Sequence, residues 1–466
     1  MLFSSIPFLY YFLPVVLLVY FLVPKIFKNT VLLLFSLIFY AWGEPKYVFL
    51  MILTVALNYG LGILIEKFRG KAISKLCLVA SLVFSLGSLA YFKYADFFIE
   101  NFNRVTGLSL GLLNIALPIG ISFYTFQILS YTIDVYRGNV KAQKNPITLG
   151  AYISLFPQLI AGPIVRYSDV ERQLIKRSHS FDKIAMGIRR FVFGLSKKII
   201  LANTLGELCE AFFSASDKSV MFYWLFALSY MLQVYFDFSG YSDMAIGLGK
   251  IFGFDFCENF RYPFISSSIS EFWRRWHISL GTWFKDYVYI PMGGNRVKNL
   301  RLFFNIFTVW FLTGFWHGAD WNFIIWGLYF AVLLLVEKFF LLKIIEKTKI
   351  LKHIYVLFFI AISFVIFSAS GLKEALSLVG GMFGFGDIPF ISESFIYNFR
   401  NYGFVILIAI LSATPLFTKL TARLASKKVP SICLDILEIP TLIALLLVIT
   451  GYLADGSFNP FLYFRF

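Results

Sequence analysis

Residues 305–336 read NIFTVWFLTGFWHGADWNFIIWGLYFAVLLLV, and they place one histidine, His317, between two apolar runs. The first run ends at Trp316 and the second begins at Phe323. Apolar stretches of this kind are typical of helices that lie in a bilayer. An ionisable side chain at that depth costs free energy, so such residues usually face a cavity or a partner and serve function. We therefore expect a helical membrane protein with a reaction centre at His317.

The composition also places this chain in a membrane. Of its 466 residues, 59% are hydrophobic and 15% are charged, whereas soluble domains hold about 25% charged residues. The apolar runs lie near residues 6–24, 31–43, 47–65, 76–92, 109–136, 185–205, 219–236, 302–316, 322–341, 352–369, 402–418 and 432–453. Because a spanning helix needs about 20 apolar residues, we predict an all-α polytopic protein with about eleven spanning helices. The short runs at 31–43 and 302–316 are expected to tilt or to follow a re-entrant path.

The positive charge lies in short loops between the apolar runs. There are 42 Lys and Arg residues against 26 Asp and Glu, which gives a net charge of +16. The cations gather at residues 25–28, 67–75, 166–177 and 419–428. This is the positive-inside pattern of cytoplasmic loops, so the charge does not predict nucleic-acid binding. We expect a multi-pass protein of the bacterial inner (plasma) membrane, with its N-terminus outside the cytoplasm and a retained first helix over Phe8–Val23.

The cysteines point to neither a disulfide framework nor a metal site. The four residues are scattered along the chain, form no CxxC pair, and lie far from any histidine at metal-ligand spacing. They are Cys77, Cys209, Cys257 and Cys433. We therefore expect small packing residues and no bound metal.

Polar residues interrupt the apolar pattern in the middle of the chain. Asp237 and Asp243 end one apolar run, and His277 follows in a stretch rich in Trp and Arg. Polar groups at membrane depth are tolerated only where protein or a water-filled cavity surrounds them. We therefore predict a central funnel that is walled by residues 237–296 and floored by His317.

The two histidines suit general acid–base chemistry. A neutral imidazole can take a proton from an attacking hydroxyl near neutral pH, and desolvation keeps the ring neutral. Asp320 lies three residues after His317, which is one turn away if the segment is helical, so it could orient that ring or equally pair with a loop cation. Arg274 precedes His277 by the same interval, and the two would then share a helix face.

Further candidates contact a donor or a substrate. Arg274 is predicted either to hold a donor phosphate or to pair with Asp237 or Asp243. Trp273 and Trp316 are predicted to line the cavity or to bind the donor.

Each candidate has a purely structural interpretation as well. His317 could be a core histidine bonded to a backbone carbonyl, and His277 could brace the fold. Asp237 and Asp243 are expected to form ion pairs or end helices more often than to act as acids. The tryptophans are common interfacial anchors. The two remaining histidines, His179 and His353, are expected to be inert.

At these residues the chain resembles the membrane-bound O-acyltransferase (MBOAT) family, and within it the branch that acetylates alginate, other exopolysaccharides and peptidoglycan. The resemblance covers nearly the whole chain as one membrane domain, residues 1–466, and is densest over 237–320. Its motifs are Met1–Ser5, Tyr40–Gly43, Ile121–Gln127, Ile133–Gly138, Phe156–Pro163, Tyr235–Arg296, Gly314–Gly318 and Asn459–Phe464.

The resemblance implies an activity and a set of partners. His317 matches the family's essential intramembrane histidine, and His277 matches the histidine of its Trp-Arg-Arg-Trp-His motif. Relatives take an acyl group from a cytoplasmic thioester such as acetyl-CoA, bind no cofactor, and pass the group to an acceptor outside. In this branch a separate SGNH/AlgJ-like extracytoplasmic acetyltransferase often completes transfer to the polysaccharide.

Three other functions stay open on the residues alone. D-alanyl transfer to teichoic acid uses the same fold with a carrier-protein thioester. A transporter of lipid-linked glycan is a different class, but such proteins commonly show repeated halves, and the polar break has no counterpart in the first half. A passive scaffold for a secreted acetyltransferase is the third.

Overall fold

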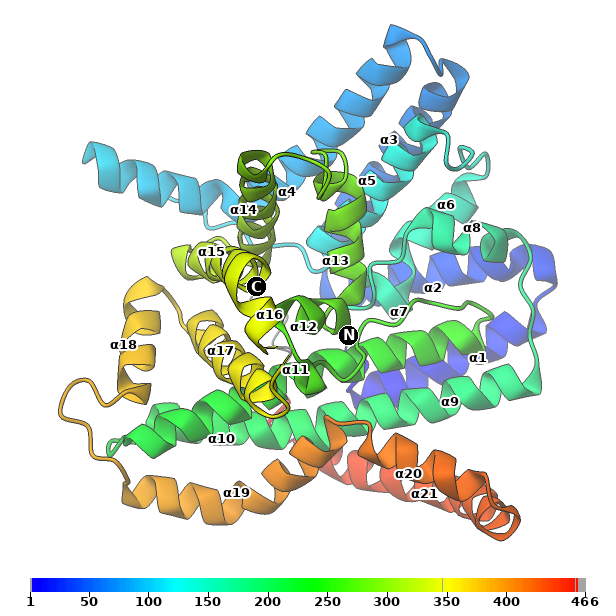
Figure 1. Cartoon of the computed structure of the whole chain (residues 1–466). Coiled ribbons are helices and arrows are strands. Elements are labelled where there is room, and N and C mark those ends of the chain that lie inside the picture. The colour runs from blue at the N-terminus through cyan, green and yellow to red at the C-terminus, as the bar shows by residue number, and fades with distance from the viewer. Residues whose placement is uncertain (1, 346, 457, 460–466) are drawn as a thin grey trace. The chain divides into compact units, whose positions relative to one another are not determined.

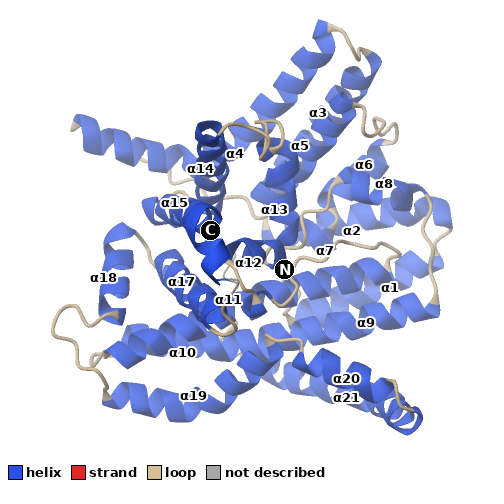
Figure 2. Cartoon of the chain, viewed as in Figure 1, coloured by secondary structure: helices blue, strands red, loops and turns tan. Residues whose placement is uncertain are grey.

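The structure is a computed structural model, and it describes residues 2–345, 347–456 and 458–459. Met1 and Pro460–Phe464, which belong to the family resemblance, lie outside these residues. The described residues form helices joined by loops and contain no strand (Figure 2). The predicted all-α fold is therefore confirmed. All four cysteines carry free thiols.

The chain forms two compact units. One consists of Met1–Phe191 and Ser242–Cys257, and the other of Val192–Tyr241 and Glu258–Phe466. Helices α9 (Phe181–Ser196) and α11 (Val220–Ile251) contribute residues to both units. The single membrane domain expected over residues 1–466 stays a prediction.

The first unit is built from long apolar helices in the N-terminal part of the chain (Figure 1). Its helices are α1 (Leu13–Leu22), α2 (Lys28–Gly43), α3 (Tyr47–Lys67), α4 (Ala72–Thr106), α5 (Ile121–Arg137), α6 (Pro146–Ser154), α7 (Phe156–Leu159) and α8 (Tyr167–Ile175). Helix α3 packs against α4 and α5, and α2 packs against α6. Phe8 packs edge to face on Phe39 and on Phe156, and all three side chains are almost fully buried.

The apolar run at 109–136 is only partly helical, which corrects the sequence-based prediction. Helix α5 begins at Ile121, and residues 107–118 are irregular. Pro118 cannot donate a backbone hydrogen bond, and Gly120 adopts a left-handed φ of 74°. A Cβ at Gly120 would lie 2.7 Å from the carbonyl oxygen of Leu159, so glycine is required there.

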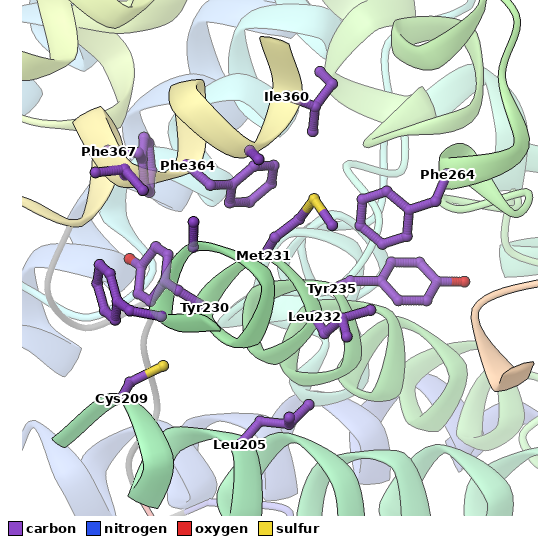
Figure 3. Close-up of a cluster of buried hydrophobic side chains, with 14 of the residues drawn as sticks. Leu205, Cys209, Tyr230, Met231, Leu232, Tyr235, Phe264, Ile360, Phe364 and Phe367 are labelled. Atoms are coloured by element: carbon purple, nitrogen blue, oxygen red, sulfur yellow. The ribbon is translucent and has the colours of Figure 1, made fainter. Parts of the chain in front are cut away.

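The second unit surrounds a large apolar core. Its helices are α10 (Asn203–Ser214), α12 (Ile269–Arg275), α13 (Ile278–Phe284), α14 (Asn299–His317), α15 (Trp321–Val336), α16 (Leu342–Ile345), α17 (Leu351–Ser368), α18 (Leu372–Met382), α19 (Glu393–Ser412), α20 (Leu416–Ala425) and α21 (Lys428–Ala454). Figure 3 shows the centre of this core, where Met231 and Tyr235 of α11 lie between Leu205 of α10 and Phe364 of α17. This core supports the residues that carry the candidate site.

Two glycines let α14 and α15 pack backbone against backbone. A Cβ at Gly314 would lie 2.3 Å from the carbonyl oxygen of Phe323, and one at Gly327 would lie 2.2 Å from that of Trp310. No side chain fits at either position, because real Cβ atoms do not approach other atoms so closely. The close crossing fixes the end of α14, where His317 lies.

Six helices in the described part of the chain are long and apolar enough to span a membrane. They are Lys25–Gly43, Tyr47–Lys67, Ala72–Thr106, Leu351–Ser368, Glu393–Ser412 and Ile432–Ala454, and a shorter apolar helix covers Pro7–Leu22. The protein is therefore polytopic, while the number of about eleven spans stays a prediction. The run at 31–43 extends back to Lys25 and reaches 19 residues.

Candidate functional site

The loop before α13 holds His277 in an unusual backbone conformation. Two side chains cap the N-terminus of helix α12. The Ser268 hydroxyl accepts a hydrogen bond of 3.0 Å from Glu271 N. The buried Glu337 carboxylate accepts hydrogen bonds of 2.6 and 3.0 Å from Ile269 N and Ser270 N. The helix ends at Arg275. His277 then adopts φ 44° and ψ 52° at the start of α13. Left-handed non-glycine residues cost free energy and cluster at functional sites.

Asn259 determines which nitrogen of His277 carries the proton. Its Oδ1 accepts hydrogen bonds from the backbone nitrogen and the hydroxyl of Ser279, at 3.2 and 2.9 Å, and lies 3.2 Å from His277 Nδ1. Because a carbonyl oxygen can only accept, Nδ1 must donate to it. His277 Nε2 is therefore left with an unprotonated lone pair in the neutral ring.

His277 is buried and neutral. The side chain is 2% exposed, and the ring packs edge-on against Phe238 at 4.7 Å between centroids. The residue lies outside the six candidate spans, and burial lowers its pKa to about 3. Within the described part of the chain, His277 Nε2 is buried and has no hydrogen-bond partner. The ring is thus a proton or hydrogen-bond acceptor whose partner is missing.

A cavity of about 580 Å³ lies against this histidine. That volume is within the range of about 300–1,000 Å³ that small-molecule sites occupy. Its wall is mainly apolar and includes Trp273 of α12 and Trp310 of α14. The indole nitrogen of Trp273 is a second buried polar atom with no hydrogen-bond partner in the residues that the structure describes. Two residues that line the cavity, His277 and Trp273, therefore each carry a buried polar atom that has no hydrogen-bond partner among the described residues.

The cavity also carries more positive than negative charge. Arg274, Lys285 and Lys338 line it and are exposed. Glu337 lines it too, but its buried carboxylate accepts hydrogen bonds from the first backbone N–H groups of α12. Cations gathered around an apolar cavity favour a ligand that has an anionic end and an apolar or amide-containing arm.

His317 lies at the last residue of α14 in an aromatic setting. Its ring packs edge to face on Trp326, at 5.1 Å, and on Phe367, at 5.3 Å, and lies 5.0 Å from the Trp316 ring. The side chain is partly exposed. His317 is not among the residues that line the cavity beside His277.

Trp316 lies next to both predicted catalytic histidines. Its indole is 4% exposed, and its centroid lies 6.2 Å from that of His277 and 5.0 Å from that of His317. Trp326 makes a second connection, because it contacts His317 and also the cavity residue Trp273, at 5.6 Å. The structure thus brings together four residues that the sequence singles out: His277, His317, Trp273 and Trp316.

The aspartates form ion pairs, which is the structural interpretation of these residues. Asp237 lies 2.7 Å from Lys198 Nζ, and both side chains are buried. Asp243 pairs with Arg190 at 2.8 Å. Within the second unit, Arg274 makes no ion pair with Asp237 in the described residues, so the alternative of an Arg274–Asp237 pair is wrong.

Two spacing arguments fail because the helices end early. Helix α12 stops at Arg275, so Arg274 and His277 do not share a helix face, although both line the cavity. Asp320 precedes the first residue of α15 in an extended conformation, and α14 ends at His317. Asp320 therefore does not lie one helical turn from His317, and its role stays a prediction.

Some residues of the site could not be identified from the sequence. Asn259 lies in the polar break, but 18 positions separate it from His277 and no periodicity links the two. Glu337 and Lys338 follow an apolar run far along the chain. A carboxylate directly after an apolar run is a weak signal, because most such groups are solvated.

Comparisons with known proteins point to one family. Residues 143–379 match the family model described as MBOAT, membrane-bound O-acyltransferase family. The chain is 43% identical over 394 residues to a probable alginate O-acetylase AlgI of Azotobacter vinelandii, covering 83% of this chain and 79% of that protein. It is 39% identical over 487 residues to the probable alginate O-acetylase AlgI of Pseudomonas putida, with complete coverage of both chains. It is 36% identical over 425 residues to a peptidoglycan O-acetyltransferase of Helicobacter pylori, covering 83% of this chain and 81% of that protein.

Proposed function

Because this chain belongs to the membrane-bound O-acyltransferase family, we propose that it moves acetyl groups from a cytoplasmic thioester across the membrane. The acetyl group would then be used to O-acetylate an extracellular polysaccharide or a cell-wall glycan. The coarser activity is that of a multi-pass membrane O-acyltransferase. Three relatives are named for O-acetyl transfer, and this favours acetyl over other acyl groups.

The observation that carries the proposal is the cavity beside His277. A pantetheine thioester, as in acetyl-CoA or an acyl carrier protein, combines an anionic phosphate with an arm of amide groups. Its phosphate would be held by Arg274, Lys285 and Lys338. Its amides would supply the N–H that His277 Nε2 lacks and the carbonyl that the Trp273 indole lacks. The exposed cations also favour a cytoplasmic opening.

The reaction needs a base for the acceptor hydroxyl. We assign that role to His317, which matches the family's essential histidine. Its imidazole takes the hydroxyl proton as the oxygen bonds to the acetyl carbonyl carbon, and the carbon–sulfur bond then breaks. The sulfur leaves as a thiolate and takes up the proton from His317, so one ester and one thiol are formed. His277 contacts the donor and positions its thioester.

Replacing His317 by Ala in the native host tests the base. General acid–base assistance is worth about 10²–10⁴-fold, so acetylation of the glycan should fall below detection while the protein level stays unchanged. His353→Ala is the matched control, since that histidine lies elsewhere and bonds the carbonyl of Ser266 at 3.0 Å. Normal acetylation in the His317 variant would show that His317 is not the base, and would favour a protein that acts as a passive scaffold for a secreted acetyltransferase.

Mass spectrometry of the glycan tests the acyl group and the class of protein. A mass gain of acetyl supports the proposal, and a gain of alanyl would assign the chain to D-alanyl transfer. In a deletion strain, unacetylated glycan should still be exported. Loss of export would instead support a transporter.

We further propose that an extracytoplasmic acetyltransferase of the SGNH/AlgJ type receives the acetyl group and completes transfer to the sugar. The chain would lie in the inner membrane with its N-terminus outside. Co-purification of the secreted partner with the full-length protein, and its loss from membranes of the deletion strain, would test this pairing.

A further inference from the structure

Two cationic side chains and one histidine meet around one tyrosine in the first unit. Lys28 Nζ lies 4.5 Å from the centroid of the Tyr20 ring, and the Arg177 guanidinium carbon lies 5.9 Å from it. His179 Nε2 lies 3.1 Å from the Tyr20 hydroxyl. Arg177 also stacks on the Phe254 ring at 4.6 Å. Aromatic faces attract cations, and they hold these groups in place.

The hydrogen bonds of Tyr20 fix the orientation of the histidine. Its single hydroxyl proton is donated to the carbonyl oxygen of Phe252 at 2.7 Å. The hydroxyl oxygen can therefore only accept from His179, so His179 Nε2 carries a proton. This leaves His179 Nδ1 for another partner. Desolvation, and then the charges of Lys28 and Arg177, lower the pKa of His179.

No carboxylate among the described residues pairs with this cluster. Within the described residues, Lys28, Arg177 and His179 form no ion pair. The nearby Asp255 is paired with Lys183 at 2.7 Å and lies 3.5 Å from Lys250. Gathered like charges repel one another, so an anion at this place would stabilise the structure.

The excess of positive charge is clearest at Arg177. One guanidinium nitrogen, Nη2, donates to the Asn29 side chain. The other, Nη1, is buried and has no hydrogen-bond partner in the part of the chain that the structure describes. A charged group buried in this way is costly unless a counter-ion lies close to it.

The surroundings of the cluster are those of a membrane interface. Lys28 lies in the first turn of the candidate span Lys25–Gly43. Leu22, Ile26 and Phe27 beside it are 74%, 81% and 54% exposed. Large apolar side chains exposed next to a cationic cluster fit a ligand that carries acyl chains as well as a negative charge.

We propose that Lys28, Arg177 and His179 bind the phosphate of an anionic phospholipid such as phosphatidylglycerol. The ammonium and guanidinium groups neutralise the phosphodiester, and His179 Nδ1 donates to it when the ring is protonated. The acyl chains lie over Leu22, Ile26 and Phe27. Free phosphate shares the headgroup chemistry but not the acyl chains, so it would bind more weakly.

Native mass spectrometry on the full-length protein in detergent tests this site. The protein is titrated with dioleoylphosphatidylglycerol, and one molecule should bind more tightly than all others. Lys28→Gln should weaken that binding about fivefold, which is the effect of about 1 kcal/mol for each basic residue near anionic lipid. Lys176→Gln is the matched control, because Lys176 is exposed in the same basic segment and should bind the lipid as the wild type does.

Two further arms separate the sources of the anion. Dioleoylphosphatidylcholine, which has no net charge, should not displace the bound lipid, and neither should inorganic phosphate. Equal binding by Lys28→Gln and Lys176→Gln would overturn the proposal. Displacement of phosphatidylglycerol by inorganic phosphate would overturn the lipid assignment, since it would identify a soluble anion as the ligand. Thermal unfolding of each variant checks that it is folded.

Discussion

Replacing Asn259 by Ala should weaken binding of the thioester donor without changing the rate of the chemical step. In Asn259→Ala the carbonyl oxygen that accepts from His277 Nδ1, at 3.2 Å, is lost. A hydrogen bond of this kind contributes about 0.5–1.5 kcal/mol, which corresponds to a factor of about 2 to 13 in the ratio of the two ring tautomers. The proton can then move to Nε2, where His277 is no longer an acceptor for the donor. The KM for the thioester should rise by about that factor, with kcat nearly unchanged.

Asn259→Asp is the informative companion. A carboxylate oxygen can still accept from His277 Nδ1 and from Ser279, so the tautomer and the KM should be kept. The new negative charge favours the protonated ring and should raise the pKa of His277, so the low-pH limb of the rate profile should move to higher pH. A merely structural role for Asn259 would not produce that shift.

Both variants can be measured in membrane vesicles that contain the full-length protein, its extracytoplasmic partner and the glycan acceptor. Acetyl-CoA is titrated, and the release of free thiol gives KM and kcat. His277→Gln belongs in the same series, because a glutamine oxygen can accept in place of Nε2 and should retain more activity than His277→Ala. A lower kcat at an unchanged KM in Asn259→Ala would contradict the positioning role, because His277 would then act in the chemical step.

Three other outcomes test the packing and the charges of the second unit. Gly327→Ala drives a methyl group into a backbone carbonyl of α14 and should destabilise the protein by about 1–3 kcal/mol in thermal unfolding, whereas Gly403→Ala, with nothing within 4 Å, should not. Lys198→Met removes one ion-pair partner of buried Asp237 and should destabilise the protein by up to about 3–5 kcal/mol; adding Asp237→Leu to it should recover most of that loss. Burial keeps the pKa of His277 at about 3 in the folded protein, below its unfolded value of about 6.5. As the pH falls below 6.5, the unfolded state binds a proton that the folded state does not, so the free energy of unfolding decreases; above pH 6.5 this group has no such effect. Between these two pKa values the free energy of unfolding of the wild type should therefore fall, relative to that of His277→Gln, by up to about 1.4 kcal/mol per pH unit. Melting temperatures of both proteins measured as a function of pH would show this difference.

The sequence alone is enough to predict a membrane protein, because hydrophobic content and loop charge depend on the solvent around the chain rather than on contacts between its residues. It also identifies His277 and His317, since an ionisable residue among apolar ones stands out at any depth. The structure brings both rings to Trp316, which no periodicity could show. Proximity of this kind depends on how helices cross.

The sequence is least informative where the backbone leaves regular structure. The helix over Ile269–Arg275 stops two residues before His277, so an argument from helical spacing fails there. The proton position on His277 depends on Asn259, which approaches only through tertiary packing. The orphaned atoms of the cavity can likewise be recognised only after every neighbour has been placed.

The buried pair of Lys198 and Asp237 also constrains how the protein is made. The two residues are separated by 39 positions, so at about 5–20 residues per second the lysine leaves the ribosome about 2–8 s before its partner. During that delay the ammonium group has no aspartate to neutralise it and favours water over hydrocarbon. The buried pair therefore cannot form until this part of α11 has been synthesised, and packing of the segment around Lys198 has to wait for that helix.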